Sequence, residues 1–203
     1  MDEVTQRIER IYAAIDASME RDPTKFPAKI AIQEGIFIGM WQDFSCGESE
    51  AQLSNIAHSV IHNIANLQDH LRKWAAHNGK DRERVDAIVK ATPALKIIKD
   101  LSDRDKHGGP RRDGGSSGLE PRLEYIRRVM LLRTKPEPNS EVLMTVNLAT
   151  GETQFGGDGS ASAVVTAEVR DKGNNLIGEL VDFQHAAVEG WEALLREYGV
   201  ALH

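Results

Sequence analysis

A single long amphipathic segment sets the architecture of this 203-residue chain. Apolar side chains recur along it every three or four positions, which is the spacing of one face of an α-helix. Ser49 and Gln52 form a capping-box pattern at its start, and Asn78 and Gly79 are typical of a helix end. We therefore predict a helix over 50–76. Its apolar face consists of Leu53, Ile56, Val60, Ile64, Leu67, Leu71 and Trp74.

Shorter patterns on either side predict further helices and then strands. Helical periodicity and capping residues mark the segments 3–20, 82–91, 93–106 and 182–198. Period-two alternation predicts a hairpin within 29–41, and β-rich runs follow at 123–134, 141–149, 152–155 and 162–170. The last helix has an apolar face but no helical partner in the β-rich segment, so we expect it to return to the N-terminal helices. The predicted fold class is α+β, a helical bundle flanked by an antiparallel β-sheet.

Length and composition fit one domain. With 40% hydrophobic and 28% charged residues, the chain is neither a disordered nor a fibrous polymer. We expect a single domain over 1–203, mainly helical over 1–107 and β-rich over 119–181, with the helix 182–199 returning to the bundle. Between the two parts, five glycines and no large apolar group in 108–118 predict a flexible loop with nothing to pack against.

The sequence gives no sign of export or of membrane insertion. Its longest apolar stretch, residues 36–41, is too short to cross a bilayer, and the N-terminus is acidic where a secretory leader would be basic. Cys46 is the only cysteine, so neither an intrachain disulfide nor a four-cysteine zinc site is possible. We therefore expect a cytoplasmic protein without a membrane partner.

A basic band interrupts an otherwise acidic chain. The net charge of −6 argues against nonspecific binding to nucleic acid, but residues 104–135 carry nine basic and four acidic side chains. Gathered on one surface, the basic side chains could hold a phosphate backbone, which makes RNA a weak candidate partner. Divided between two strand faces, they would simply be solvated. The band consists of Arg104, Lys106, Arg111, Arg112, Arg122, Arg127, Arg128, Arg133 and Lys135.

The face of the long helix opposite its apolar stripe carries unusual polar residues. They are weaker helix formers than Glu, Lys or Gln, so a hydrogen-bonded packing surface or a ligand site would explain them. If the helix over 93–106 packs antiparallel to the long helix, its end lies near His58 and His62. The polar sector consists of His58, His62, Asn66, Asp69 and His70.

Two of these residues have the spacing of metal ligands. His58 and His62 are four positions apart, so one helix can offer both imidazoles to one ion. Such pairs are also common as hydrogen-bonded packing residues, and that alternative stays open. An ion would need a third ligand from elsewhere, with the candidates Asp69, Asp103 and His107.

Two segments resemble helices of a group of uncharacterised bacterial helical proteins. The first is a Leu-x-Asp-His-Leu helix at 67–71, and the second is an Asp-x-x-Lys-His helix end at 103–107. Those proteins are in turn distantly similar to the HEPN superfamily, small helical bundles that include metal-independent ribonucleases. The resemblance implies His107 as general acid or base and Asp69 as a polar partner on the facing helix. It also implies a phosphate contact from Arg104 or Lys106.

No complete catalytic set or cofactor motif accompanies these residues. The run 114–118 has the letters of the G-x-S-x-G nucleophile elbow, but it lies in a glycine-rich loop instead of a strand-to-helix turn. The same loop lacks the Gly-Lys-Ser/Thr ending of a phosphate-binding P-loop. We therefore predict no cofactor and take a non-catalytic interaction or accessory protein as the leading hypothesis, with a second copy or another protein as partner. The alternatives are an HEPN-like RNA-binding protein, ribonuclease or toxin, and a metal-binding helical protein. We also predict core positions for Trp41, Trp74 and Trp191.

Overall fold

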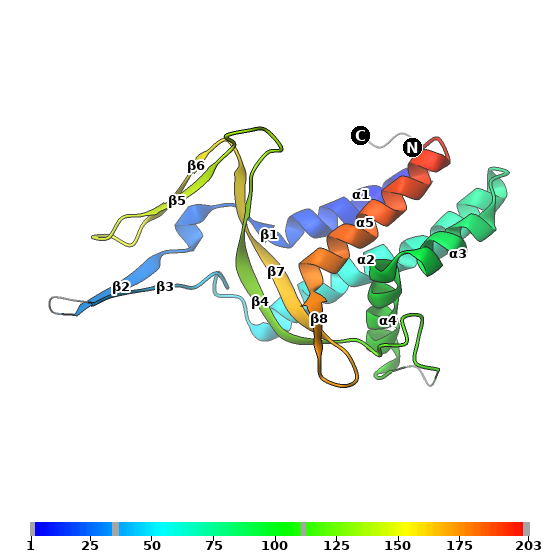
Figure 1. Ribbon diagram of the computed structural model, residues 1–203, viewed down its shortest axis with the longest axis horizontal. Helices are drawn as coiled ribbons and strands as arrows, with labels where there is room; N and C mark the ends of the chain where they lie inside the picture. The colour runs from blue at the N-terminus through cyan, green and yellow to red at the C-terminus, as the bar shows by residue number, and fades with distance from the viewer. Residues whose placement is uncertain (1–2, 34–36, 111–112, 201–203) are drawn as a thin grey trace. The chain divides into compact units, whose positions relative to one another are not determined.

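A computed structural model describes residues 3–33, 37–110 and 113–200 of the chain. These residues form helices and antiparallel sheets, which confirms the predicted α+β class (Figure 1). Contacts divide the chain into two compact units, the helical unit (1–18, 54–126 and 166–203) and the hairpin unit (19–53 and 127–165). Each unit combines segments that are distant in sequence. The single folding domain expected from the sequence stays a prediction, because contacts do not measure independent folding.

Every predicted helix is present within one to three residues of its expected ends. The helix over 50–76 begins with a capping box, in which the Ser49 amide donates to Gln52 Oε1 (2.8 Å) and the Gln52 amide donates to Ser49 Oγ (3.3 Å). Nowhere in the described ranges is a helix both long and apolar enough for a bilayer crossing. The helices are α1 (Glu3–Ala17), α2 (Glu50–His77), α3 (Arg82–Ala91), α4 (Pro93–His107) and α5 (Leu180–Glu197).

Helix α5 lies at the centre of the helical core. Trp191 is only 2% exposed and donates its indole N–H to the carbonyl oxygen of Ile64 in α2 (3.1 Å). The Tyr12 hydroxyl of α1 donates to Glu192, which ties α5 to the first helix as well. The last helix therefore contacts both α1 and α2. Fully buried side chains of this unit include Ile61, Ile64, Leu71, Ile98, Leu194 and Leu195.

The largest sheet has the order β1-β7-β4, with β8 pairing β7 as well. Strands β4 (Arg122–Arg133) and β7 (Ser160–Arg170) are the long members and run from one unit into the other. The short strands β1 (Met19–Glu20) and β8 (Leu176–Glu179) pair antiparallel with different ends of β7. These two strands were not predicted, because two and four residues are too few to show alternation.

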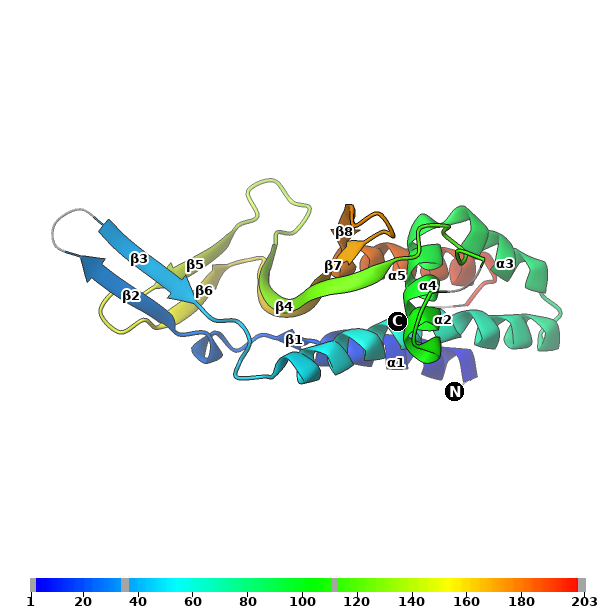
Figure 2. The same ribbon diagram turned by 90° about the horizontal axis from the view of Figure 1, so that it is seen from below.

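The hairpin unit contains two antiparallel hairpins (Figure 2). The predicted first hairpin is confirmed as β2 (Ala28–Gln33) and β3 (Phe37–Gln42), while its turn lies outside the described residues. The second joins β5 (Val142–Val146) to β6 (Thr153–Gly157), and a short 3-10 turn (Pro23–Lys25) precedes β2. The hairpins are hydrogen-bonded to each other, because the Ala28 amide donates to the Gly151 carbonyl (2.8 Å). Gly151 has φ 76°, and a Cβ there would lie 2.2 Å from the Ala28 oxygen, so only glycine fits.

The three tryptophans do not share one environment. Trp191 is buried as predicted. Trp74 is half-buried and contacts the ring of Tyr198, with 5.9 Å between ring centroids. The core position predicted for Trp41 is wrong, because this side chain is 59% exposed on the two-stranded β2–β3 hairpin, opposite Lys29.

The glycine-rich segment after α4 is tied to the helix by one carboxylate. Asp100 is 6% exposed and accepts the backbone N–H groups of Ser116 (2.6 Å) and Ser117 (2.7 Å). Gly115 has φ 73°, and a Cβ there would lie 2.5 Å from Asp100 Oδ1, which explains the glycine at this position. The expectation that this loop has nothing to pack against is therefore wrong. Polar groups hold the loop, and the absence of large apolar side chains does not reveal them.

Candidate metal centre

The polar sector of α2 contacts the C-terminal half of α4. A hydrogen bond joins His62 Nδ1 to Ser102 Oγ (2.8 Å), and Lys106 Nζ donates to Asn66 Oδ1 (2.7 Å). Both helices belong to the helical unit, so this contact lies within one compact body. The end of α4 therefore meets the part of α2 that carries the predicted histidine pair.

Three metal-ligating side chains converge at this contact. His62 Nε2 lies 2.7 Å from Asp105 Oδ2, and His58 Nδ1 lies 3.6 Å from Asp105 Oδ1. One potential ligand atom from each of the three residues lies within 4.8 Å of the other two. The structure thus combines the predicted histidine pair with a carboxylate from α4.

A buried hydroxyl orients the His62 ring. Ser102 is fully buried, and its Oγ bonds Nδ1 of the imidazole, so that Nε2 faces Asp105. Histidine ligands of metals almost always bond a second protein group through the nitrogen that does not hold the ion, which fixes the ring and its tautomer. His62 is therefore placed as a metal ligand would be, even though its Nε2 bonds Asp105 in this structure.

His58 presents a buried nitrogen toward the same carboxylate. Its Nδ1 is inaccessible to solvent and forms no hydrogen bond with any of the described residues, although a buried polar atom normally has a partner. Burial lowers the pKa of His58, a shift that the Asp105 carboxylate partly opposes and the His62 imidazole reinforces. A lowered pKa keeps the imidazole neutral, which is the form that binds metal ions.

A pocket of about 420 Å3 adjoins the three side chains. His58 and Asp105 contribute to its wall, and the half-buried Arg104 lies beside them. Within the described part of the chain, the Arg104 guanidinium forms no hydrogen bond or ion pair. The apolar part of the wall consists of Leu101, Leu123 and Ile126.

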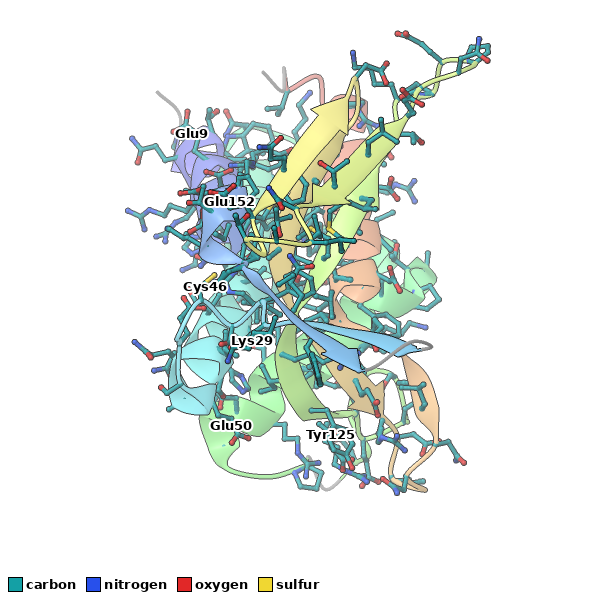
Figure 3. All side chains as sticks on the ribbon, turned by 90° about the vertical axis from the view of Figure 1, so that its left-hand side faces the viewer. Glu9, Lys29, Cys46, Glu50, Tyr125 and Glu152 are labelled. Carbon is teal, nitrogen blue, oxygen red and sulfur yellow. The ribbon has the colours of Figure 1, made fainter. Side chains whose placement is uncertain are left out.

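A distortion of β4 shapes that apolar wall. Leu123 and Ile126 are three positions apart, so in a regular strand they would point to opposite faces. Tyr125 between them has φ 52°, a left-handed conformation that is costly for a bulky residue and breaks the alternation. Both apolar residues line the pocket. The Tyr125 side chain, which is labelled in Figure 3, is instead 69% exposed.

The other predicted site residues are not assembled in this way. Asp69 and His107 are exposed, and neither side chain forms a hydrogen bond or ion pair within residues 3–33, 37–110 and 113–200. Asp103 is half-buried on α4 and does not belong to the metal-ligating group. Lys106 bonds Asn66, and Arg104 lines the pocket. The acid-base set implied by the HEPN resemblance is thus not brought together by the described contacts.

The carboxylate that contacts the histidine pair, Asp105, is not among the third ligands predicted from the sequence. The signal was present in α4, where the buried positions Ile98 and Ser102 are followed at helical spacing by Asp105. Extending that stripe past its last apolar residue would have placed the carboxylate on the face that meets α2.

Much of the basic band is occupied by internal interactions. Arg122 donates to Glu124 Oε1 (2.8 Å) and to the Asp171 carbonyl (2.7 Å). The Arg128 side chain is only 4% exposed and pairs with Glu48 (2.7 Å). Guanidinium groups engaged in this way are not available to a phosphate backbone, so the band offers less to RNA than its composition indicates.

Comparison with known proteins yields no relative on which a function could be based. No family model, curated protein or solved structure matches the chain. The HEPN resemblance therefore stays a prediction, and the function of the chain has to be inferred from the geometry of its own residues.

Proposed function

We propose that this is a metal-binding protein whose centre holds one divalent transition-metal ion, such as Zn2+, through His58, His62 and Asp105. The observation that carries the proposal is the convergence of two imidazoles of α2 and one carboxylate of α4, with ligand atoms within 4.8 Å of one another. Two histidines and one carboxylate are a donor set that suits zinc and ferrous iron.

The distances support this assignment. Ligand atoms of a tetrahedral zinc ion with bonds of about 2.1 Å lie roughly 3.4 Å apart. The 3.6 Å between His58 Nδ1 and Asp105 Oδ1 is already close to that value. The 2.7 Å contact between His62 and Asp105 is a hydrogen bond of the metal-free protein, and side-chain rotation would open it by about 0.7 Å.

The carbonyl end of α4 makes one local electrostatic contribution that favours a cation. Asp105 lies in the last turn of α4, where the backbone carbonyl dipoles give the helix end a partial negative charge. A divalent ion would replace the hydrogen bond between His62 and Asp105 and would give the buried His58 nitrogen a partner. Binding would thereby give a ligand bond to the buried His58 Nδ1, which forms no hydrogen bond with any of the described residues.

Three protein ligands would leave at least one coordination position of the ion open. Structural zinc sites are closed by four protein ligands, whereas sites that bind small molecules keep a position free. The adjoining pocket of about 420 Å3 provides room for an exogenous ligand there. We therefore propose an open metal centre. The accessory role and the RNA-binding alternative remain predictions from the sequence.

The test is a zinc competition titration of the purified full-length chain against a chromophoric chelator. We expect one equivalent of zinc to bind, and we expect His58→Ala and Asp105→Asn each to weaken binding by more than about 100-fold, because each removes a direct ligand. The matched control is His185→Ala, which removes an exposed imidazole that pairs with Glu189 on α5.

Circular dichroism of each variant shows whether it is folded. Equal zinc affinity in wild type, His58→Ala and Asp105→Asn would contradict the proposal. So would a wild-type chain that binds no stoichiometric zinc, or an equal loss of affinity in the His185→Ala control.

A further inference from the structure

We infer that the pocket beside the metal centre binds a small organic oxyanion, with its charged group between the metal ion and Arg104. The charged group is a carboxylate or a phosphate monoester, and the organic part lies against Leu101, Leu123 and Ile126. This inference rests on the proposed function, because one oxygen of the ligand occupies the open position of the metal ion.

The charge balance of the pocket supports an anion. A divalent ion together with Asp105 and Arg104 would give the site a net charge of about +2, which a neutral ligand would leave uncompensated. No hydrogen bond or ion pair to another described residue occupies the Arg104 guanidinium. Arginine binds the two oxygens of a carboxylate or phosphate side by side, which suits this role better than a point charge.

The second cation in the wall does not compete for the ligand. Arg122 also lines the pocket, but its guanidinium already donates to Glu124 and to the carbonyl of Asp171. Arg104 is therefore the residue that selects the charge of the ligand.

The apolar wall supports an organic body on that anion. Leu101 comes from α4, and Leu123 and Ile126 come from the distorted segment of β4. A volume of about 420 Å3 lies within the range of small-molecule sites, roughly 300–1,000 Å3. Strained backbone clusters at binding and catalytic sites, and the strained Tyr125 lies between the two β4 residues that line the pocket.

The experiment measures binding of three probes to the zinc-loaded full-length chain by isothermal titration calorimetry. Phenylphosphonate and benzoate represent the two oxyanions, and benzyl alcohol is the neutral control. We expect at least one anion to bind with a Kd below about 1 mM and benzyl alcohol to bind at least about tenfold more weakly. The tighter anion identifies the phosphate or the carboxylate as the natural charged group.

Two substitutions separate the parts of the pocket. Arg104→Gln should weaken binding of the anion about tenfold or more while the chain still takes up one equivalent of zinc. The matched control is Arg84→Gln, because Arg84 is an exposed arginine that pairs with Glu197. Leu123→Ala should weaken phenylphosphonate more than methylphosphonate, since only the former has a body that reaches the apolar wall.

The outcomes distinguish this inference from the proposed function. A chain that binds zinc but neither anion, or that binds benzyl alcohol equally well, would overturn the inference and leave the metal centre intact. Unchanged anion affinity in Arg104→Gln would overturn it as well. A chain that binds no zinc would overturn both, and the zinc titration alone reveals that case.

Discussion

Helix α2 contacts its neighbours through two faces of opposite chemistry. On the apolar face, Ile64 and Leu71 are fully buried, and the Ile64 carbonyl accepts the indole N–H of Trp191. On the polar face, the His58 and His62 side chains retain 26% and 25% exposure and meet a carboxylate of α4. The first face removes apolar area from water and supplies stability. The polar face gains little free energy from burial. Its contribution is the fixed arrangement of the two imidazoles and the carboxylate.

The largest effect is expected on the apolar face. Trp191→Ala should lower the free energy of unfolding by about 3–5 kcal/mol, because it leaves a large cavity at a side chain that is only 2% exposed and removes the indole hydrogen bond to Ile64. Urea denaturation measures the change.

Trp191→Phe is the matched control for the indole. It keeps most of the apolar area but removes the donor and part of the ring system, so we expect a smaller loss of about 1–2 kcal/mol. A loss below about 1 kcal/mol in Trp191→Ala would show that the apolar face is not the main source of stability.

A smaller effect, on binding rather than on folding, is expected on the polar face. Ser102→Ala removes the hydroxyl that orients His62, so zinc affinity should fall about tenfold while the helices remain folded. The zinc competition titration measures the loss, and Ser102→Thr, which keeps the hydroxyl, is the comparison variant. Zinc affinity unchanged within about twofold would mean that the ring needs no positioning residue.

The smallest effect is expected at the exposed margin of the polar face. Lys106 and Asn66 are both exposed, and their hydrogen bond competes with water. Lys106→Ala should therefore change the free energy of unfolding by less than about 1 kcal/mol and leave zinc affinity unaltered. Thermal unfolding and the same titration check both values. A clear loss of zinc affinity would extend the metal centre to the helix end that the HEPN resemblance singles out.

The two faces of α2 also differ in how far the sequence predicts them. The apolar face and the ends of α2 follow from periodicity and from the Ser49 capping box, because these are local signals. The same holds for His58 and His62, which share one helix at a spacing of four. Asp105 lies on another helix. The stripe of buried positions in α4 indicates the face on which it lies, but which helix that face meets depends on how α4 packs.

The remaining discrepancies have the same origin. The Asp100 carboxylate holds a loop that composition alone describes as unattached. Trp41 has a large apolar side chain of the kind found in cores, but it lies on a two-stranded hairpin. The residues next to it in the sequence do not indicate that it is exposed. The partners of Asp100 are more than ten residues away in the sequence. Trp41 is exposed because no described layer of the structure covers its side chain on the hairpin. Tertiary context overrides composition and propensity at such positions.

The most direct test of the metal centre is anomalous X-ray diffraction at the zinc edge from crystals of the zinc-loaded chain. We expect one strong peak about 2.0–2.2 Å from His58 Nδ1, His62 Nε2 and an oxygen of Asp105. A zinc ion ligated instead by other residues, such as Asp69 or His107, or an unbroken His62–Asp105 hydrogen bond beside an ion-free site at saturating zinc, would contradict it.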